Sequence, residues 1–302
     1  MRSIRITIAA LFIVSVATIA SAQATRTWIS ATGADANPCS RTAPCLTYSS
    51  AISKTATGGI INSIDSSSGG AVTITKSILI DSSPDFGHIL GSGTNGIIIN
   101  ITDGADTAST VIIRGIDIHG GGTGFDGIRI LSAKKVIIEN CRIERFTGQG
   151  IDIVSSVLKT QVIVRNCRIT NNTSQGISAT FTGAGSTVLY VEDSEISQNG
   201  SSAIDLIANA SAIVGNCHLI QNGSAGVFAQ AASTDADVAF SKLEQNIIAA
   251  SAQNGGTIRL YNSHLTHNTT SVSGNVLSHG NNAVIANPTN NLPALVPAPS
   301  LQ

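Results

Sequence analysis

An eight-residue pattern returns along the middle of the chain and constrains the fold more than any other feature. It reads apolar, any, apolar, charged, Asn, small, charged, aliphatic. The copies are VIIENCRI from Val136, VIVRNCRI from Val162, LYVEDSEI from Leu189, AIVGNCHL from Ala212, ADVAFSKL from Ala236 and IRLYNSHL from Ile258, with a looser VIIRGIDI from Val111. The fifth positions are Asn140, Asn166, Asp193, Asn216, Phe240 and Asn262, at steps of 26, 27, 23, 24 and 22 residues. A repeat of this length indicates one small structural unit that is stacked many times.

The repeated units are predicted to be strands, because apolar residues alternate within them and Val, Ile and Thr dominate. In the unit from Val162, Val162 and Val164 point to the same side of the strand, and the next inward residue is Cys167. Three residues separate Val164 from Cys167, whereas side chains of a straight strand return to the same side every two residues. A bend at Asn166 accounts for the extra residue, since Asn tolerates the left-handed backbone of a tight bend. A second column follows at Asn172, Asn199, Asn222, Asn246 and Asn268. Two corners and a return loop predict three strands per turn.

Consecutive turns of such a coil lie about 4.8 Å apart, with equivalent residues stacked in parallel register. Stacked Asn amides can then hydrogen-bond along the coil axis. On these repeats the chain resembles the right-handed parallel β-helix, the fold of pectate lyases, polygalacturonases and many secreted polysaccharide-binding proteins, over roughly residues 58–280. The resemblance implies an all-β, right-handed parallel β-helix of the pectin-lyase-like kind. This is a solenoid with three strands per rung and an N-terminal capping helix.

The sequence divides into four segments. Residues 1–22 are typical of a signal peptide, with Arg2 and Arg5, an apolar run from Ile6 to Ala20 and a small-x-small cleavage site ending at Ala22. A membrane anchor is the alternative, but the apolar core is short for a span. Residues 23–59 form the predicted cap, residues 60–280 the β-helix and residues 281–302 a Pro-rich C-terminal tail. The signal predicts a secreted or periplasmic protein with no membrane span after its removal.

Five cysteines in an exported chain indicate at least one disulfide. Cys39 and Cys45 lie in the Pro-flanked loop NPCSRTAPC and are predicted to pair, just before a helix expected over residues 46–55 that covers the open end of the coil. Cys141, Cys167 and Cys217 share one small inward position, which Ser fills in other rungs. A metal site is the alternative for these three. A column of buried small residues explains them, so no metal site is predicted.

Charged side chains are sparse, at 12% of the residues, and the net charge is -1. This balance provides no basic surface for nucleic acid, so no nucleic-acid partner is predicted. No motif in the sequence indicates an organic cofactor. Calcium, which some pectate lyases of the resembled fold require, is left open by the sequence.

Outward positions of a stacked coil form columns, and two of them are charged. The column Arg114, Glu139, Arg165 and Glu192 alternates in sign and predicts a salt-bridge ladder. The column Asp117, Arg142, Arg168, Glu195, His218, Lys242 and His264 is richer in cations. It fits an acidic glycan as well as a solvated face. The binding candidates for a polysaccharide are Arg142, Arg168, His218 and Lys242, with Phe228 from another strand.

A third outward column is apolar and comprises Ile112, Ile137, Ile163, Tyr190 and Ile213. A continuous apolar stripe is unusual on an exposed surface. We therefore expect it to be covered, either by the tail segment Leu292–Leu301 or by a second subunit in a homo-oligomer.

The remaining strand of each turn supplies the candidate catalytic residues. Its outward column reads Arg129, Asp152, Ser178, Asp205 and Phe228. In enzymes of the resembled fold, substrate grooves commonly run along this strand. Asp152 and Asp205 are expected two rungs apart, about 9.6 Å between backbone atoms, near the upper end of the separations of about 6.5 to 9.5 Å between the carboxyl groups of inverting glycosidases. The catalytic candidates are Asp152, Asp205 and Arg129, although a salt bridge explains Arg129 beside Asp152 equally well.

Motifs of known enzymes of this fold are missing from the sequence. Polygalacturonases carry Asn-Thr-Asp, an Asp pair, Gly-His-Gly and Arg-Ile-Lys, and Ser278-His279-Gly280 is the only near match. Aromatic platforms for sugars are few, with Trp28, Tyr190, Phe228 and Tyr261 scattered. The sequence favours a non-catalytic secreted β-helix protein that binds polysaccharide or serves in an extracellular or envelope assembly. A polysaccharide lyase or glycoside hydrolase is the alternative.

Overall fold

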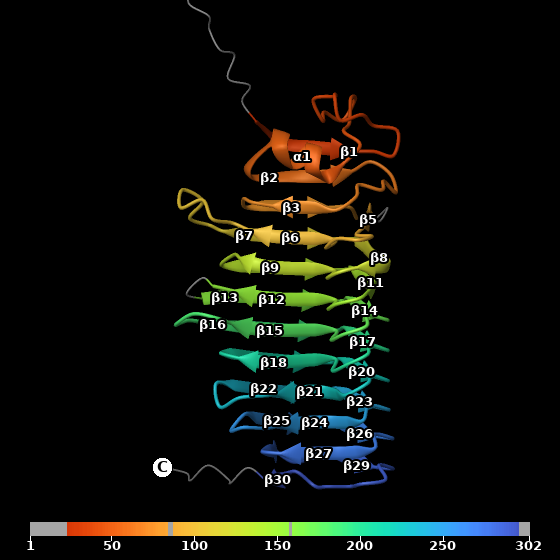
Figure 1. The fold of residues 1–302 in the computed structure, drawn as a ribbon, viewed down its shortest axis with the longest axis vertical. Coiled ribbons are helices and arrows are strands. Elements are labelled where there is room, and N and C mark those ends of the chain that lie inside the picture. The colour runs from red at the N-terminus through yellow and green to blue at the C-terminus, as the bar shows by residue number, and fades with distance from the viewer. Residues whose placement is uncertain (1–22, 84–86, 157–158, 296–302) are drawn as a thin grey trace, which may run out of the picture.

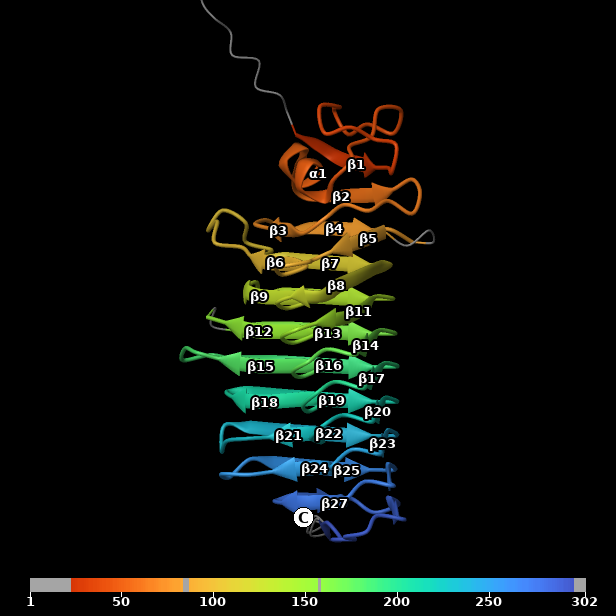
Figure 2. The same cartoon turned by 45° about the vertical axis from the view of Figure 1, so that its right-hand side comes forward.

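The computed structural model describes residues 23–83, 87–156 and 159–295. The predicted signal peptide, residues 1–22, and the last seven residues of the predicted tail lie outside these ranges. The described chain winds into an elongated coil whose strands stack in register from one end to the other (Figures 1 and 2). All strand pairs are parallel and join consecutive turns, so the predicted three-stranded rung of a parallel solenoid is confirmed.

Three sheets run along the coil, and each takes one strand from each regular turn. Sheet 1 contains β1 (Ala24–Ile29), β2 (Thr55–Ser63), β4 (Ile78–Asp81), β7 (Thr110–Arg114), β10 (Lys135–Glu139), β13 (Lys159–Arg165), β16 (Ser186–Glu192), β19 (Ala210–Gly215), β22 (Thr234–Ala239), β25 (Thr257–Tyr261), β28 (Val276–Ser278) and β30 (Ala294–Leu295). Sheet 2 contains β5 (Gly87–Leu90), β8 (Ile116–Gly124), β11 (Arg142–Phe146), β14 (Arg168–Thr170), β17 (Glu195–Ser197), β20 (His218–Ile220), β23 (Lys242–Glu244), β26 (His264–Thr266) and β29 (Ala283–Ile285). Sheet 3 contains β3 (Val72–Ile74), β6 (Ile97–Asn100), β9 (Ile128–Ser132), β12 (Ile151–Ser155), β15 (Ile177–Phe181), β18 (Ile204–Ala208), β21 (Ala225–Ala229), β24 (Ile248–Ala252) and β27 (Thr270–Gly274).

The core is a column of inward aliphatic side chains, because alternate residues of every strand point into the coil. In β10, Val136 and Ile138 are fully buried while Ile137 between them faces outward. Cys141, Cys167 and Cys217 are free thiols buried at one inward position, as the column of small residues predicted. Burial raises the pKa of the Cys217 thiol to about 12, so this sulfur stays protonated as an ordinary core atom.

The first corner, between sheets 1 and 2, bends at the predicted Asn column. Asn140, Asn166, Asp193, Asn216, Phe240 and Asn262 all have positive φ, between 45° and 52°. Their side chains also connect turns, since Asn166 donates to Asn140 and Asn216 Nδ2 donates to Asp193 Oδ1 at 2.7 Å. The predicted left-handed bend at this corner is confirmed.

The second Asn column lies inside the coil, one residue after the bend that it was expected to make. The left-handed residues of this corner include Asn171 (φ 57°) and Gln198 (φ 55°). The next side chain turns inward and forms a buried amide ladder, in which each Nδ2 donates to the Oδ1 one turn further along. The ladder is Asn172 to Asn199 (3.0 Å), Asn199 to Asn222 (3.0 Å), Asn222 to Asn246 (3.1 Å), Asn246 to Asn268 (3.2 Å) and Asn268 to Asn287 (3.1 Å).

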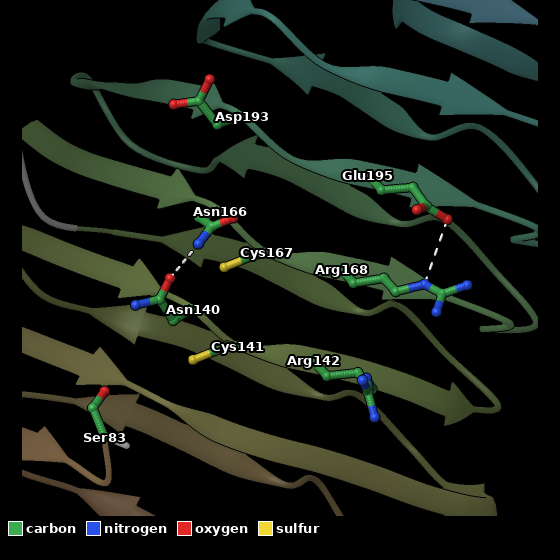
Figure 3. Close-up of a pocket in the computed structure, with 9 residues that line it drawn as sticks. All are labelled: Ser83, Asn140, Cys141, Arg142, Asn166, Cys167, Arg168, Asp193 and Glu195. Carbon is green, nitrogen blue, oxygen red and sulfur yellow. Dashed lines mark hydrogen bonds and ion pairs between the residues drawn. The ribbon is translucent and has the colours of Figure 1, made fainter. Parts of the chain in front are cut away.

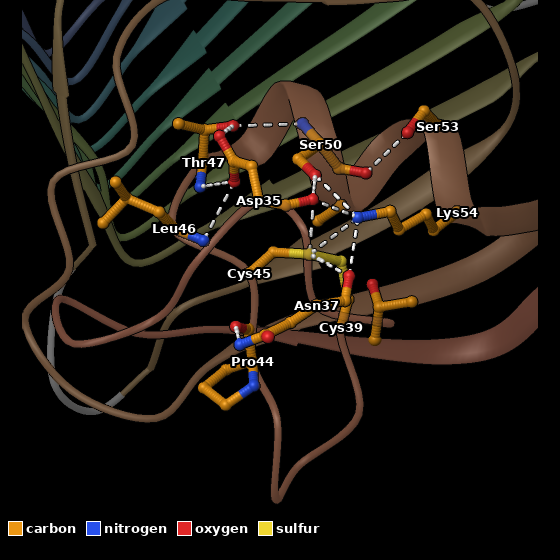
Figure 4. The surroundings of a disulfide bond; sticks show 12 residues. Asp35, Asn37, Cys39, Pro44, Cys45, Leu46, Thr47, Ser50, Ser53 and Lys54 are labelled. Carbon is orange, nitrogen blue, oxygen red and sulfur yellow. Dashed lines mark hydrogen bonds between the residues drawn. A yellow bond between two sulfur atoms is a disulfide. The ribbon is translucent and has the colours of Figure 1, made fainter.

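The N-terminal end of the coil is covered by the helix α1 (Tyr48–Lys54), which begins after Thr47 as its N-cap. The Thr47 side chain accepts the Ser50 backbone N–H at 3.1 Å, satisfying one of the free amides of the first turn. Cys39 and Cys45 form the predicted disulfide beside this helix (Figure 4). Lys54 Nζ donates to the carbonyl oxygens of Asp35 and Asn37, each at 2.6 Å, so the helix end and the segment that leads into the disulfide form one cap.

At the other end, the first part of the predicted tail continues the stacking. β29 pairs with β26 and β30 pairs with β28. Asn287 extends the buried amide ladder. Residues 283–295 therefore form a last, irregular turn at the end of the coil, and their position next to β28 places them away from the apolar stripe on β7 to β19.

Candidate functional site

Three outer faces of the coil carry the side chains that the sequence singled out. The salt-bridge ladder and the apolar stripe lie on sheet 1, the cation-rich column on sheet 2 and the carboxylate column on sheet 3. The predicted binding residues are therefore divided. Arg142, Arg168, His218 and Lys242 belong to sheet 2, whereas Phe228 belongs to sheet 3 and lies next to Asp205.

The carboxylate column is the outward column of sheet 3. Asp152 pairs with Arg129 on one side and with Ser178 on the other, and Ser178 pairs with Asp205. Asp152 and Asp205 are consequently two turns apart, about 9.6 Å between equivalent backbone atoms. Although they belong to an outward column, Asp152 is 6% exposed and Asp205 is 2% exposed. The structure confirms the shared column and shows that both carboxylates are buried.

Asp152 has a weak charge partner for so buried a carboxylate. Its Oδ2 lies 3.7 Å from Arg129 Nε. Arg129 also pairs with Asp126, at 3.2 Å between Nη1 and Oδ2, so one guanidinium serves two acids. Burial raises the pKa of Asp152, the Asp126 charge raises it further and Arg129 lowers it, to a pKa of about 6. A carboxyl group with this pKa exchanges its proton close to neutral pH, as general acids and bases do.

Asp205 is held more firmly than Asp152. Gln230 Nε2 donates to Oδ1 at 2.7 Å and Gln175 Nε2 donates to Oδ2 at 3.1 Å. Burial raises the pKa of Asp205, and these two amide hydrogen bonds limit the rise. The two amides fix the orientation of the carboxylate and already occupy both of its oxygens. Asp205 therefore resembles a structural anchor more than a group free to transfer a proton.

Sequence reasoning missed the residues that surround these acids. Asp126 immediately precedes the repeat segment GIRI, and its Oδ1 accepts the Gln149 backbone N–H at 3.0 Å. Gln175 and Gln230 lie in loops, where strand parity does not indicate the direction of a side chain. The Asp-Gly step before the strand is the one sequence signal that marked Asp126 as a turn residue.

The cation-rich column on sheet 2 separates into a paired part and an unpaired part. Arg142 Nη1 lies 3.6 Å from Asp117 Oδ2, and Arg168 Nε lies 3.4 Å from Glu195 Oε1. The next three residues in register are His218, Lys242 and His264, which are all exposed. In the described part of the chain none of these three has an acidic group within 4 Å. The basic side chains without an acidic partner are thus concentrated on β20, β23 and β26.

A shallow hollow of about 560 Å³ lies at the first corner beside the paired part of this column (Figure 3). Asn140 and Asn166 point toward one another at its edge, and Arg168 reaches Glu195. The Cys141 and Cys167 thiols lie behind it, each at most 4% exposed. Burial, followed by the neighbouring Cys167, raises the pKa of Cys141. Among the described residues, no group of three or more His, Cys, Asp or Glu side chains is arranged to hold a metal ion.

Two aromatic rings meet on the same corner, further along the coil. Phe240 and Tyr261 have ring centroids 5.4 Å apart and planes at 89°, an edge-to-face pair. Phe240 is 60% exposed and Tyr261 42% exposed. Phe240 stands where five other turns carry Asn or Asp and has their left-handed backbone, with φ of 52°. Tyr261, which looked isolated in the sequence, thus forms an exposed pair with Phe240, which the sequence analysis did not count among the aromatic platforms. Lys242 lies two residues after Phe240, and His264 lies three residues after Tyr261.

Comparison with known proteins supports the fold. Residues 43–190 match a family model described as a right-handed β-helix region. The structure of pectate lyase Pel9A is similar with a TM-score of 0.59 at 14% identity, over 92% of this chain and 83% of that one. The GH136 lacto-N-biosidase from Eubacterium ramulus is similar with a TM-score of 0.64 at 10% identity, over 90% of this chain and 66% of that one. No curated protein sequence matches this chain. At identities this low, the structural similarity shows a shared fold alone.

Proposed function

We propose that this right-handed parallel β-helix protein, pectate lyase-like in fold, binds an acidic polysaccharide on its outer surface without cleaving it. The observation that carries the proposal is the exposed aromatic pair of Phe240 and Tyr261 beside the unpaired column of His218, Lys242 and His264. We call these five residues the corner patch.

The corner patch combines the two features that recognition of a charged sugar requires. Exposed aromatic rings offer apolar area that a soluble protein otherwise hides, and such patches mark binding sites. Lys242 supplies a positive charge without an intramolecular partner, and the imidazole rings of His218 and His264 on either side can hydrogen-bond to a sugar. A carboxylate-bearing sugar that packs on the rings therefore meets the complementary charge of Lys242, which lies two residues after Phe240 on the same turn.

The other faces of the coil support this reading less well. Arg142 and Arg168 already pair with acids, so a ligand would compete with existing ion pairs. Phe228 is half-buried on sheet 3. A signal-like N-terminus and a disulfide are compatible with an extracellular setting. Among the described residues, no helix has the length and hydropathy needed to cross a membrane.

The test is affinity electrophoresis of the mature protein in gels that contain either an acidic polysaccharide, such as polygalacturonate, or a neutral glucan. We expect retardation in the acidic gel, weakened at high salt because exposed charges are screened. Phe240→Ala and Lys242→Ala should each reduce the retardation several-fold. Phe125→Ala is the matched control, because Phe125 is 55% exposed on a different part of the surface. Equal retardation of the Phe240 and Phe125 variants would refute the proposed site.

A second candidate function, carboxylate-assisted cleavage of a polysaccharide, is favoured by Asp152. A buried acid with a pKa of about 6 is suited to proton transfer at neutral pH. Asp205 lies two turns away, and Arg129 lies beside Asp152. Unsaturated products or new reducing ends that disappear in Asp152→Asn would establish this alternative.

A further inference from the structure

The apolar stripe on sheet 1 is longer in the structure than in the repeat pattern. In register, it comprises Ile60, Leu79, Ile112, Ile137, Ile163, Tyr190 and Ile213. The column then changes character, because its next two members, Asp237 and Arg259, form an ion pair at 3.3 Å. Ile213, at the border of the stripe, is 44% exposed. The stripe is thus a bounded apolar strip on an otherwise polar coil.

A ladder of alternating charges runs along one side of the stripe, two residues further along each strand. Arg114 lies 3.3 Å from Asp81 and 2.9 Å from Glu139. Arg165 lies 3.5 Å from Glu139 and 3.2 Å from Glu192. The predicted salt-bridge ladder is therefore confirmed and gains Asp81 as a fifth member. Seen from outside, sheet 1 presents an apolar line beside a line of charges whose sign changes at every turn.

The tail segment Leu292–Leu301 is too short to cover the whole of this stripe. Ala294 and Leu295 are fixed beside β28, at the far end of sheet 1. The six residues from 296 to 301 span at most about 21 Å when fully extended. Eight turns separate β30 from β7 in the sheet order, which corresponds to about 38 Å.

We propose that a second copy of this chain covers the stripe, in a two-fold dimer in which sheet 1 packs face to face on sheet 1 and the two coils run antiparallel. A two-fold axis along the strand direction places each column opposite its own copy with the turns in reversed order. Centred between β10 and β13, this operation sets Glu139 against the partner's Arg165 and Arg114 against the partner's Glu192. The same operation sets Ile137 against the partner's Ile163.

The charge pattern distinguishes this arrangement from the other two-fold choice. With the coils parallel, the ladder would face the outward column on the other side of the stripe, which contains Thr110, Lys135, Gln161 and Val188. That choice opposes charges of unlike sign in one symmetry-related pair of contacts, Glu139 against Lys135. The antiparallel arrangement opposes them in two such pairs of contacts, and complementary charge fixes register and suppresses wrong pairings.

The size of the face indicates a reversible dimer. The stretch from β4 to β19 covers six turns, about 24 Å in length, and the three outward columns are about 13 Å across. A face of this size, roughly 310 Å² on each partner, is smaller than the roughly 800 Å² per partner of a standard specific interface. We therefore expect dissociation on dilution and not an obligate dimer.

The first test is sedimentation velocity of the mature protein over a thousand-fold range of concentration. We expect a shift from monomer to dimer as concentration rises. Ile137→Asp combined with Ile163→Asp should raise the dimer dissociation constant at least ten-fold. Ile285→Asp is the control, because Ile285 is 60% exposed on β29 of sheet 2 and outside the face. If the double variant does not fold, Arg165→Glu, which sets Glu against Glu139 of the partner, should weaken the dimer in its place.

The second test measures the orientation of the two coils. A nitroxide label on Asp237→Cys lies on the stripe column in β22, three and a half turns from the proposed axis. The two labels of an antiparallel dimer are then separated along the coils by seven turns, roughly 34 Å, whereas parallel coils would bring them to about the 10 Å spacing of packed sheets. A monomer at every concentration, or a label separation near 10 Å, would overturn the proposal.

Discussion

Replacing Asp152 with Asn should stabilise the folded protein at neutral pH. The pKa of Asp152 is raised from 3.8 to about 6, chiefly because the side chain is buried. The folded state therefore disfavours the charged carboxylate relative to the unfolded chain. A difference of about 2 pKa units corresponds to roughly 3 kcal/mol at pH 7. Asn is uncharged and of similar shape, so it removes this cost. The pKa of about 6 already includes the opposing effect of Arg129, whose Nε lies 3.7 Å from the carboxylate, so the figure is a net cost.

The sign of the pH dependence follows from proton binding. Between about pH 4 and pH 6 the folded wild type binds more protons at Asp152 than the unfolded chain does. Its free energy of unfolding therefore falls as the pH rises through this window and stays lower above it. The Asn variant has no titrating group at this position, so this contribution to the pH dependence of its stability is absent. The two proteins should have similar stability near pH 4, and the variant should be more stable by about 3 kcal/mol at pH 7.

Urea unfolding followed by circular dichroism at pH 4, 5, 6 and 7 measures this difference. Asp237→Asn serves as the control, because Asp237 is exposed and its substitution should give a difference that hardly depends on pH. An Asp152→Asn protein that is less stable than the wild type at pH 7, or a difference that is constant from pH 4 to pH 7, would refute the assignment of a buried, destabilising carboxyl group.

Three further substitutions test the packing of the coil. Asn222→Ala should lower the free energy of unfolding by about 3 kcal/mol, because it removes a buried link of the amide ladder and leaves neighbouring donors unsatisfied; urea titration measures the loss. Gly176→Ala should lower the free energy of unfolding by about 1 to 3 kcal/mol, because the added Cβ would lie 2.3 Å from a methyl group of Ile196. Gly215→Ala is the control and should leave the stability unchanged in the same assay, because its Cβ would have no neighbour within 4 Å. Replacing Cys39 and Cys45 with Ser should destabilise the cap by about 2 kcal/mol, as expected for a short closed loop, and proteolysis of the N-terminal loop reports it.

The architecture could be predicted because each turn repeats one local solution. In each eight-residue repeat, apolar and polar residues alternate as they do in a strand, and the break in this alternation at Asn166 indicates a bend. Because the residue types recur in the same order in every repeat, the repeats are expected to stack in register. The columns predicted from this logic, including Asp152 and Asp205, are the columns that the structure shows.

The position of the second bend was predicted one residue too late. A column of Asn residues predicts left-handed backbone at those residues, and at the first corner this prediction is confirmed. At the second corner, the left-handed residue is Gln198 in one turn and Asn171 in another, and the following Asn is used for its amide. Buried carbonyl and N–H groups at that corner need partners, and Asn199 supplies both a donor and an acceptor to adjacent turns. Sequence alone does not separate these two uses of Asn.

The candidate sites were only partly predictable, because loops contribute to them. Gln230 and Gln175 reach Asp205 from loops that have no strand parity. Phe240 and Tyr261 occupy neighbouring but non-equivalent positions of the repeat, and their rings meet diagonally because the chain bends there. Contacts of this kind depend on the course of the corner, which a repeat pattern does not specify.

Titration calorimetry of the wild type with an acidic polysaccharide, followed by assay of the same sample for unsaturated ends and reducing ends, tests the proposed function most directly. Binding without cleavage predicts a saturable heat of binding, lost in Phe240→Ala, and a polymer of unchanged length. A polymer that shortens with the wild type and stays intact with Asp152→Asn would contradict it and identify the protein as an enzyme.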